Sequence, residues 1–399
     1  MLIYNLIRNL LKQNGNKDIV FTMNKSVSGK NTWHFHSDLF WLRVIPTGVF
    51  TRKAIFIGFK NSKTGEVVGT YVCLTYRKRL LEYRIKWLIN FYTNNIINNK
   101  YYIIPLDKTI SPYNPIQALR ARKNDYYLLN CNKNDVIDSW GCAYIPKTDF
   151  DFDNFCFKTL KNMKSLEKDN ITLADCFFDI NNENMVLLED QGTFETAVIS
   201  KYDISKGWKK VSDNIMKSGL HSSYPISFKY NKKVYALPNI FADIDEIDFF
   251  IRTQNGKFEK SGYKLNVLGK DIQDFTPFEY KGLWYSYGTN PVCTILRLYV
   301  SDNPFNNWVE HNCSPVNIGL FGSRPAGNII KVNNNIYRLG QNCQDVYGGS
   351  ISIFKILRLT KDEYEEQFIK ELKLPSEYFS FHTFNVGKDK IIFDYKKYR

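Results

Sequence analysis

Apolar and polar positions repeat along the chain from residue 170 onward, with a period of about 50 residues, the length of one four-stranded propeller blade. Each repeat has an apolar strand, a short turn rich in Asn, Lys or Gly, and a second strand with an aromatic residue. Tyr235, Tyr285 and Tyr337 occupy equivalent points. The four repeats read FFDINNENMVLLE, ISFKYNKKVYALP, PFEYKGLWYSYG and NIIKVNNNIYRLG.

A third and a fourth strand follow each of these segments, as in LRLYVSDNPFNNWVEH, where a turn precedes Trp308; Trp208 has the same place in the first repeat. FHTFNVGKDKIIFDY begins a fifth unit. The pattern therefore predicts a mainly β fold, a C-terminal five-bladed β-propeller over residues 169–399. It leaves open whether strands of the N-terminal region also take part in closing the ring.

Residues 1–168 read as a smaller α+β region. Leu2, Ile3, Leu6, Ile7, Leu10 and Leu11 have the spacing of an amphipathic helix. Residues 54–76 predict a β-hairpin, and residues 77–96 a basic amphipathic helix. That helix either packs with a solvated basic face or lies on an anionic membrane surface. A further helix is expected over 154–168, with the domain boundary after it.

Composition adds three expectations. The aromatic content of 16% suits strand surfaces and sugar-stacking sites. The net charge of +14 favours anionic partners such as phosphates, nucleotides, anionic lipids or acidic glycans, although Lys and Asn enrichment is also typical of an AT-rich genome. The eight cysteines are scattered singly, which indicates a reducing cytosol and no zinc site. We expect a cytoplasmic protein, either free or peripheral at the membrane, with no specific nucleic-acid partner. Neither the oligomeric state nor a required cofactor can be derived.

Two families of propeller resemble this sequence. Ala174–Phe178, ADCFF, resembles the first-blade opening of the arabinanase and β-xylosidase type glycosidases, with Cys176 where those enzymes have Pro. The propeller domain at the N-terminus of glucosamine inositolphosphorylceramide transferases, found also in bacterial proteins of surface-glycan clusters, is more similar. SRPAGNI, QNC and YGG are the most specific shared segments, and the likeness covers about residues 170–399. The resemblance implies a protein that handles a carbohydrate.

The innermost strand of each blade lines the central channel, so residues that open these strands converge although they are distant in sequence. Sugar recognition requires hydroxyl-binding polar groups and aromatic faces, and the converging set supplies both. We expect Asp175, Asp274 and His221 as catalytic residues. The expected substrate-binding residues are Tyr224, Arg324, Asn328, Gln341, Asn342, Tyr347 and His382.

Hydrolysis of a glycoside normally requires two carboxyl groups across the scissile bond. Asp175 resembles the base of the propeller glycosidases. The second blade has Ser223, Tyr224 and Pro225 where those enzymes have an Asp before Pro, and the third has Asp274 near the place of the acid Glu. Asp175 and Asp274 could instead cap strand-end amides.

His221 and His382 could be core histidines, and Arg324 either forms a structural ion pair or binds a phosphate or carboxylate. Three functions stay open. The first is a glycosyltransferase of surface-glycan synthesis that uses a phosphorylated donor such as a nucleotide sugar, with a glycan or sugar phosphate as substrate. The others are a non-catalytic carbohydrate-binding propeller and a glycosidase. Asp243-Ile244-Asp245 has the letters of a nucleotide-sugar D-x-D motif, and no metal-ligand spacing is evident.

Overall fold

The structure is a computed structural model. Contacts divide the chain into two units, Met1–Cys131 with Ile318–Leu320, and Asn132–Asn317 with Phe321–Arg399. The residues that the structure describes are 2–15, 19–23, 26–27, 31–37, 54–65, 67–73, 86, 89–90, 92–94, 96–97, 140–168, 171–191, 196–240, 246–265, 272–289, 295–318, 321–343 and 347–397.

The first unit contains one helix and one four-stranded sheet in the order β1-β2-β3-β4. Helix α1 (Leu2–Asn14) buries Ile7, Leu10 and Leu11, as its periodicity predicts. Strands β3 and β4 form the predicted antiparallel hairpin, whereas β1 and β2 are parallel. The strand bounds are β1 (Val20–Thr22), β2 (Thr32–Ser37), β3 (Ala54–Asn61) and β4 (Val67–Cys73).

The predicted basic helix lies mostly outside the described residues, as does Asp243-Ile244-Asp245. Within residues 77–96, Lys86, Ile89, Asn90, Tyr92, Thr93, Asn94 and Ile96 are helical. Ile89, Tyr92 and Ile96 are buried at the spacing of one helix face. No helix among the described residues has the length and apolar character needed to span a bilayer.

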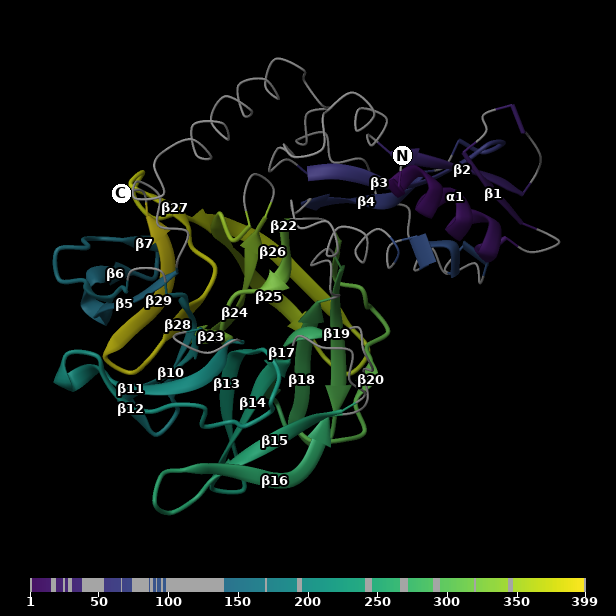
Figure 1. The fold of residues 1–399 in the computed structure, drawn as a ribbon. Coiled ribbons are helices and arrows are strands. Elements are labelled where there is room, and N and C mark those ends of the chain that lie inside the picture. The colour runs from purple at the N-terminus through teal and green to yellow at the C-terminus, as the bar shows by residue number, and fades with distance from the viewer. Residues whose placement is uncertain are drawn as a thin grey trace. The chain divides into compact units, whose positions relative to one another are not determined.

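The described part of the second unit contains five larger sheets, the blades of the propeller, drawn teal to yellow in Figure 1, and one two-stranded sheet. The predicted fold class is confirmed. Blade 1 has the order β9-β10-β11-β12, blade 2 β13-β14-β15-β16, blade 3 β17-β18-β19-β20, and blade 4 β22-β24-β25-β26. Tyr235, Tyr285 and Tyr337 pair with Phe228, Phe278 and Ile330 in blades 2, 3 and 4, so the repeat has a common register.

The strands of these four blades are mostly four to ten residues long. They are β9 (Leu173–Asp179), β10 (Asn182–Asp190), β11 (Val198–Asp203), β12 (Lys209–Ser212), β13 (Ser222–Tyr230), β14 (Lys233–Ile240), β15 (Ile247–Arg252), β16 (Phe258–Leu265), β17 (Gln273–Tyr280), β18 (Leu283–Thr289), β19 (Ile295–Ser301), β20 (Val309–Glu310), β21 (Asn317–Ile318), β22 (Phe321–Pro325), β23 (Ile330–Val332), β24 (Asn335–Asn342), β25 (Ser350–Leu359) and β26 (Tyr364–Leu372). The short β21 and β23 pair with β19 and β24, and a 3-10 turn, η3 (Ile204–Lys206), follows β11.

Blade 5 joins segments from two distant parts of the chain. Its order is β27-β29-β5-β8, with β28 also paired to β29. Strand β29 (Lys390–Lys397) pairs along its length with β5 (Gly141–Pro146), so the N-terminal side does supply strands for ring closure. The other strands are β8 (Lys164–Leu166), β27 (Tyr378–Ser380) and β28 (Phe384–Val386).

Two expectations about this region are corrected. The propeller unit begins near residue 132, not at 169, because β5 and β8 belong to blade 5. Residues 154–168 are not helical: η2 (Lys147–Asp149) leads into a hairpin of β6 (Phe150–Asp151) and β7 (Cys156–Phe157), followed by a turn and β8. Strand pairing and the burial of Phe155 among propeller residues outweigh the local helical spacing.

A β-bulge interrupts the inner strand of blades 1 to 4 near its start. The first bulged residue has a positive φ each time: Asp175 at 49°, Tyr224 at 47°, Asp274 at 54° and Gly322 at 75°. Three of these are not glycine, and such backbone is strained in L-residues. The bulges aim successive blade openings toward the ring centre.

A buried ion pair lies within blade 4 and joins strands β24 and β26. Arg338, only 2% exposed, pairs bidentately with Glu366, and its guanidinium lies 3.9 Å from the centre of the Phe354 ring. Arg338 Nη1 also donates to the carbonyl oxygen of Gly322 at 2.7 Å. The pair therefore fixes the bulge that opens blade 4.

We predict that Arg338→Ala lowers the free energy of unfolding by roughly 3–5 kcal/mol, because it leaves Glu366 without its buried partner. Urea unfolding measures this change. Arg358→Ala, on the same blade, is the matched control: its ion pairs with Glu363 and Glu365 are more than half exposed, and the expected change is within about 0.5 kcal/mol. Equal effects of the two substitutions would contradict the assignment.

Candidate functional site

The inner strands meet at the centre of the ring, where Tyr224 of blade 2 contacts two other blades. Its hydroxyl lies 3.0 Å from Thr276 Oγ1 in blade 3 and accepts a hydrogen bond of 3.0 Å from Gly327 N in blade 4. Tyr224 is 1% exposed, and burial raises its pKa far above the usual value. The expected substrate-binding residue thus forms a contact across the channel.

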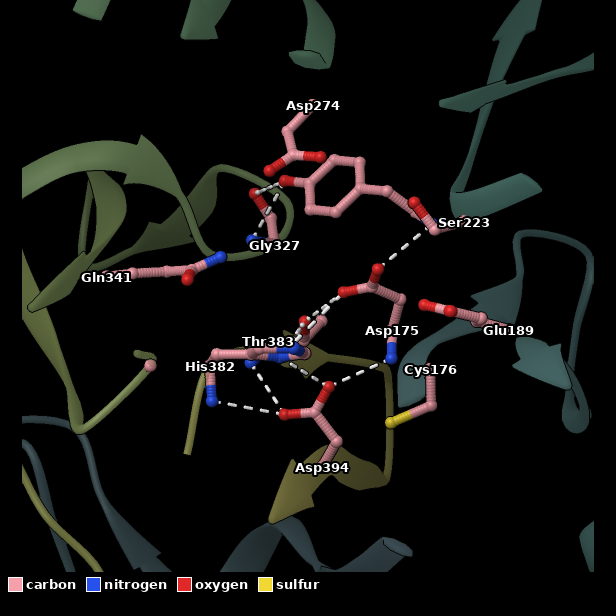
Figure 2. A network of polar contacts seen from close by, with 12 residues as sticks. Asp175, Cys176, Glu189, Ser223, Asp274, Gly327, Gln341, His382, Thr383 and Asp394 are labelled. Carbon is pink, nitrogen blue, oxygen red and sulfur yellow. Dashed lines mark hydrogen bonds and ion pairs between the residues drawn. The ribbon is translucent and has the colours of Figure 1, made fainter. Parts of the chain in front are cut away.

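Asp175 is held by groups from blades 2 and 5. Its Oδ1 accepts a hydrogen bond of 2.7 Å from the Thr383 hydroxyl, and its Oδ2 one of 3.2 Å from Tyr224 N. His382 Nδ1 lies 3.8 Å from Oδ1. Figure 2 shows the side chains of Asp175, His382 and Thr383 lying close to one another. The structure therefore brings together Asp175, Tyr224 and His382, as the sequence predicts.

Asp394, on β29, is the acceptor at the base of this network. It is fully buried, and it accepts hydrogen bonds from the backbone amides of Asp175 at 2.9 Å, His382 at 3.1 Å and Thr383 at 2.8 Å. Its Oδ2 also lies 2.7 Å from His382 Nδ1. One carboxylate thus fixes the backbone on both sides of the junction between blades 5 and 1.

The imidazole of His382 is enclosed by aromatic rings. It stacks on Trp140 with ring centres 3.8 Å apart, and the Tyr347 ring meets it edge-on at 5.5 Å. Burial works to lower the pKa of His382, but the charge and hydrogen bond of Asp394 outweigh it, so the net shift is upward. The raised pKa of His382 favours its protonated form beside Asp175.

The environment of Asp175 favours its protonated form. Burial is the largest cause and raises the pKa of the carboxyl to about 7. His382 opposes this shift, whereas the negative charges of Glu189, Asp274 and Asp394 reinforce it. Asp175 thus titrates near neutral pH, in the range suited to proton transfer.

Asp274 opens blade 3 and pairs with Arg324 of blade 4. Arg324 Nε donates to Asp274 Oδ2 at 2.5 Å, and the guanidinium lies 5.1 Å from the centre of the Tyr347 ring. Asp274 Oδ1 is buried and has no hydrogen-bond partner among the described residues. Because a buried unpartnered oxygen costs about 1–3 kcal/mol, a hydroxyl group or water at this position would be strongly favoured.

The other predicted residues have separate places. Gln341 is buried and donates to the Pro325 carbonyl at 3.0 Å, which holds the segment after Arg324. Asn342 donates to Glu371 at 2.8 Å, on the outer strand of blade 4. Asn328 is half-buried, and its backbone amide donates to Asn385.

His221 does not join the central network. Its Nε2 lies 3.4 Å from Glu189 Oε1, and its side chain is 37% exposed. The hydrogen bond to Glu189 raises the pKa of His221. His221 therefore lies beside Glu189, whose strand partner is Ala174, the residue before Asp175. The catalytic role of His221 stays a prediction.

Asp175, His382 and Asp394 are also close enough to hold a cation. One ligand atom from each lies within 4.8 Å of the others. However, His382 Nδ1 already bonds to Asp394, and the carboxylate oxygens of Asp394 accept amide hydrogens. These internal bonds satisfy the donor atoms, so the geometry fits a shared proton better than a metal.

Sequence reasoning missed Thr383, Asp394 and Trp140. Thr383 directly follows the predicted His382, so the YFSFHTF segment contained a usable signal. Asp394 lies on the second strand of the fifth unit, and Trp140 lies in the region assigned to the N-terminal part. Neither has a counterpart in the blade repeat that would single it out.

The fold and site define a five-bladed β-propeller with a buried carboxyl–imidazole network at the junction of its first and last blades. A sequence model of one protein family matches residues 163–383, more than half of the chain. The chain therefore belongs to this family, which is described as "Glucosamine inositolphosphorylceramide transferase 1, N-terminal". The resemblance seen in the sequence is confirmed.

Curated relatives carry the same designation. Glucosamine inositolphosphorylceramide transferase 1 of Oryza sativa subsp. japonica is 26% identical over 208 residues, which is 49% of this chain and 27% of that protein. The protein of that name from Arabidopsis thaliana is 26% identical over 207 residues, covering 49% and 26%. The chain thus spans about a quarter of the length of these relatives.

Solved structures with some likeness include glycoside hydrolases. Zg3597, a family 117 glycoside hydrolase of Zobellia galactanivorans, is 12% identical with a TM-score of 0.40, covering 58% of this chain and 87% of that one. A thermostable family-43 glycoside hydrolase is 11% identical with a TM-score of 0.39, covering 52% and 78%.

The raised pKa values predict a pH-dependent stability. Because the pKa of Asp175 is raised to about 7, the folded state binds more protons than the unfolded chain between about pH 4 and 7. The raised pKa of His382 adds to this difference above about pH 6.5. Stability from this network therefore falls as the pH rises through that window. Asp175→Asn should flatten the decrease in Tm between pH 5 and pH 8, measured by thermal unfolding.

Asp389→Asn is the control, because it removes the same charge from an exposed carboxyl group. It should leave the pH dependence of Tm close to that of the wild type. If Asp175→Asn retained the full wild-type slope, Asp175 could not be the titrating group.

Proposed function

We propose that this propeller acts on a carbohydrate and takes part in transferring a glycosyl group to a hydroxyl, with Asp175 as the general base. The observation that carries the proposal is the Asp175 carboxyl at the ring centre, whose pKa burial raises to about 7. A general base is most effective when its pKa lies near the working pH.

In this reaction the acceptor hydroxyl loses its proton to Asp175 while its oxygen attacks the anomeric carbon of the donor. The bond between that carbon and the donor phosphate breaks, and the phosphate leaves with the electron pair. His382, held against Asp175 and Asp394, is placed to share the proton afterwards. The proposed donor is a nucleotide sugar.

Asp274, Arg324 and Tyr347 are the proposed sugar-positioning groups. Asp274 Oδ1 can accept a hydrogen bond from a sugar hydroxyl, and Arg324 fixes the orientation of this carboxylate through Oδ2. Tyr347 is half-buried and offers an aromatic surface beside them. A donor phosphate bound by Arg324 would have to compete with Asp274 for its guanidinium.

The name of the relatives supports transfer over hydrolysis, since it speaks of a transferase, glucosamine and inositolphosphorylceramide. Transfer of glucosamine, or of another sugar, to an acceptor of this kind is a proposal for this chain. The ion pair of Asp274 with Arg324 argues against a glycosidase, because a carboxylate in an ion pair has no proton to donate to a leaving group.

A non-catalytic carbohydrate-binding propeller is the second candidate. The observation that favours it is the double engagement of Asp175, which accepts hydrogen bonds from Thr383 and from the Tyr224 amide. Such bonds also suit a carboxyl group that only stabilises the blade junction. The two candidates differ in whether a donor bond is broken.

Release of nucleotide from a panel of nucleotide sugars, including derivatives of glucosamine, tests the proposal in the presence of glycan and inositol-containing acceptors. We predict release that increases with pH through about 7, as Asp175 loses its proton. Asp175→Asn should reduce the rate on the order of 10²- to 10⁴-fold, and Asp389→Asn should leave it unchanged.

Arg324→Ala should raise KM more than it lowers kcat, because it disturbs the orientation of Asp274 rather than the base. Glycan binding without nucleotide release from any donor would favour the binding propeller. Equal rates for wild type and Asp175→Asn would exclude Asp175 as the base.

A further inference from the structure

A cavity with a volume of about 800 Å³ lies in the propeller unit. The segment Phe155–Lys161, which includes β7, forms one wall, and the end of β26 with the segment up to Tyr378 forms the other. None of its lining residues belongs to the network around Asp175. Its volume is within the range of about 300–1,000 Å³ that is typical of small-molecule sites.

Part of the cavity lining is apolar. Phe155 and Leu372 are buried in the core between blades 4 and 5, and Phe157, Leu160, Leu374 and Tyr378 pack partly buried against that core. These side chains form an aromatic and aliphatic surface whose hydration is unfavourable. Burying such a surface under a ligand is favourable because it removes apolar area from water.

Four lysines line the same cavity, Lys158, Lys161, Lys370 and Lys373, and all four are exposed. Lys373 pairs with Glu371 at 3.0 Å. Lys370 donates a hydrogen bond to the carbonyl oxygen of Asn154, which is uncharged and does not neutralise the ammonium group.

The ammonium groups of Lys158 and Lys161 have no hydrogen-bond or ion-pair partner among the described residues. Glu371 is occupied by Ser350, Asn342 and Lys373, which lower its pKa although burial opposes the shift. The cavity rim is therefore positive, with Glu377 as the other acidic lining residue.

We propose that this cavity binds the phosphate-bearing end of an amphiphile. The apolar segment next to the phosphate lies against Leu160, Leu374 and Tyr378. The phosphate is held by Lys158 and Lys161 at the rim. An apolar surface and a cluster of ammonium groups within one cavity match a ligand that carries both features, and neither a neutral sugar nor a free phosphate uses both.

Binding of a short-chain anionic lipid below its micelle concentration tests this site. Dihexanoyl phosphatidylinositol is the probe, dihexanoyl phosphatidylcholine tests the need for net negative charge, and inositol 1-phosphate tests the need for the apolar segment. Calorimetry with the full chain should show tighter binding of the first probe than of either comparison ligand.

Cys156 provides a local readout because its half-buried thiol lines the cavity, whereas the exposed Cys313 lies in blade 3. The bound anionic lipid should slow maleimide labelling of Cys156 several-fold and leave Cys313 unaffected, as measured by peptide mass spectrometry. Equal protection of both thiols, or of neither, would overturn the assignment of the site.

The double substitution Lys158→Gln with Lys161→Gln should weaken binding of the anionic lipid on the order of 10-fold, because each lysine attracts the phosphate. Leu374→Ser should weaken it without altering its salt dependence. Lys229→Gln with Lys233→Gln removes the same charge from exposed positions of the β13–β14 hairpin and should have no effect.

Equal weakening by both lysine pairs would reduce the effect to net charge and overturn the proposal. Binding of inositol 1-phosphate as tight as that of the lipid would also overturn it, as would equally tight binding of the phosphatidylcholine. Thermal unfolding of each variant confirms that it is folded. Because this cavity does not include Asp175 or Asp274, loss of binding here and loss of glycosyl transfer are separately measurable.

Discussion

The carboxylate of Asp394 is the interaction on which the rest of the propeller centre depends. It accepts hydrogen bonds from the backbone amides of Asp175, His382 and Thr383, and it pairs with Nδ1 of the His382 ring. These contacts join the first blade to the last. Its buried negative charge also acts on its neighbours, raising the pKa of both Asp175 and His382. Asp394 therefore links ring closure to the acidity of the site, while burial remains the largest cause of the raised pKa of Asp175.

Close backbone packing at the ring centre is a second constraint, and it explains the glycines of the most specific sequence segments. Gly327 of SRPAGNI has a φ of 129°, and a Cβ there would lie 2.3 Å from the carbonyl oxygen of Phe384. Gly348 of YGG would similarly place a Cβ 2.5 Å from His382. Gln341 of QNC holds the carbonyl of Pro325. These segments bring backbone close to the ring centre, where no larger side chain fits.

The repeat at Tyr235, Tyr285 and Tyr337 was enough to predict the propeller, because strand pairing within a blade is local and each hairpin has its own turn. The convergence of Asp175, Asp274, Arg324 and His382 could then be predicted, because the residues that open the blades lie at the centre of the ring. The fifth unit was predicted only from its C-terminal strands. Its partner strands could not be predicted, since the pairing of Cys142 with Asp394 spans most of the chain and leaves no periodic signal. The prediction of a helix at 154–168 was wrong because the local spacing of apolar residues carries no information about packing against a neighbouring blade.

The composite fifth blade has a consequence for the order in which this unit is made. Strand β5 leaves the ribosome before the first four blades, yet its pairing partner β29 follows all of them. Until β29 docks, β5 has no second neighbour, and the amides around Asp175 lack their acceptor. The buried environment of Asp175 is therefore absent from a nascent chain that has not reached β29, so the raised pKa of Asp175 arises only when the ring is complete.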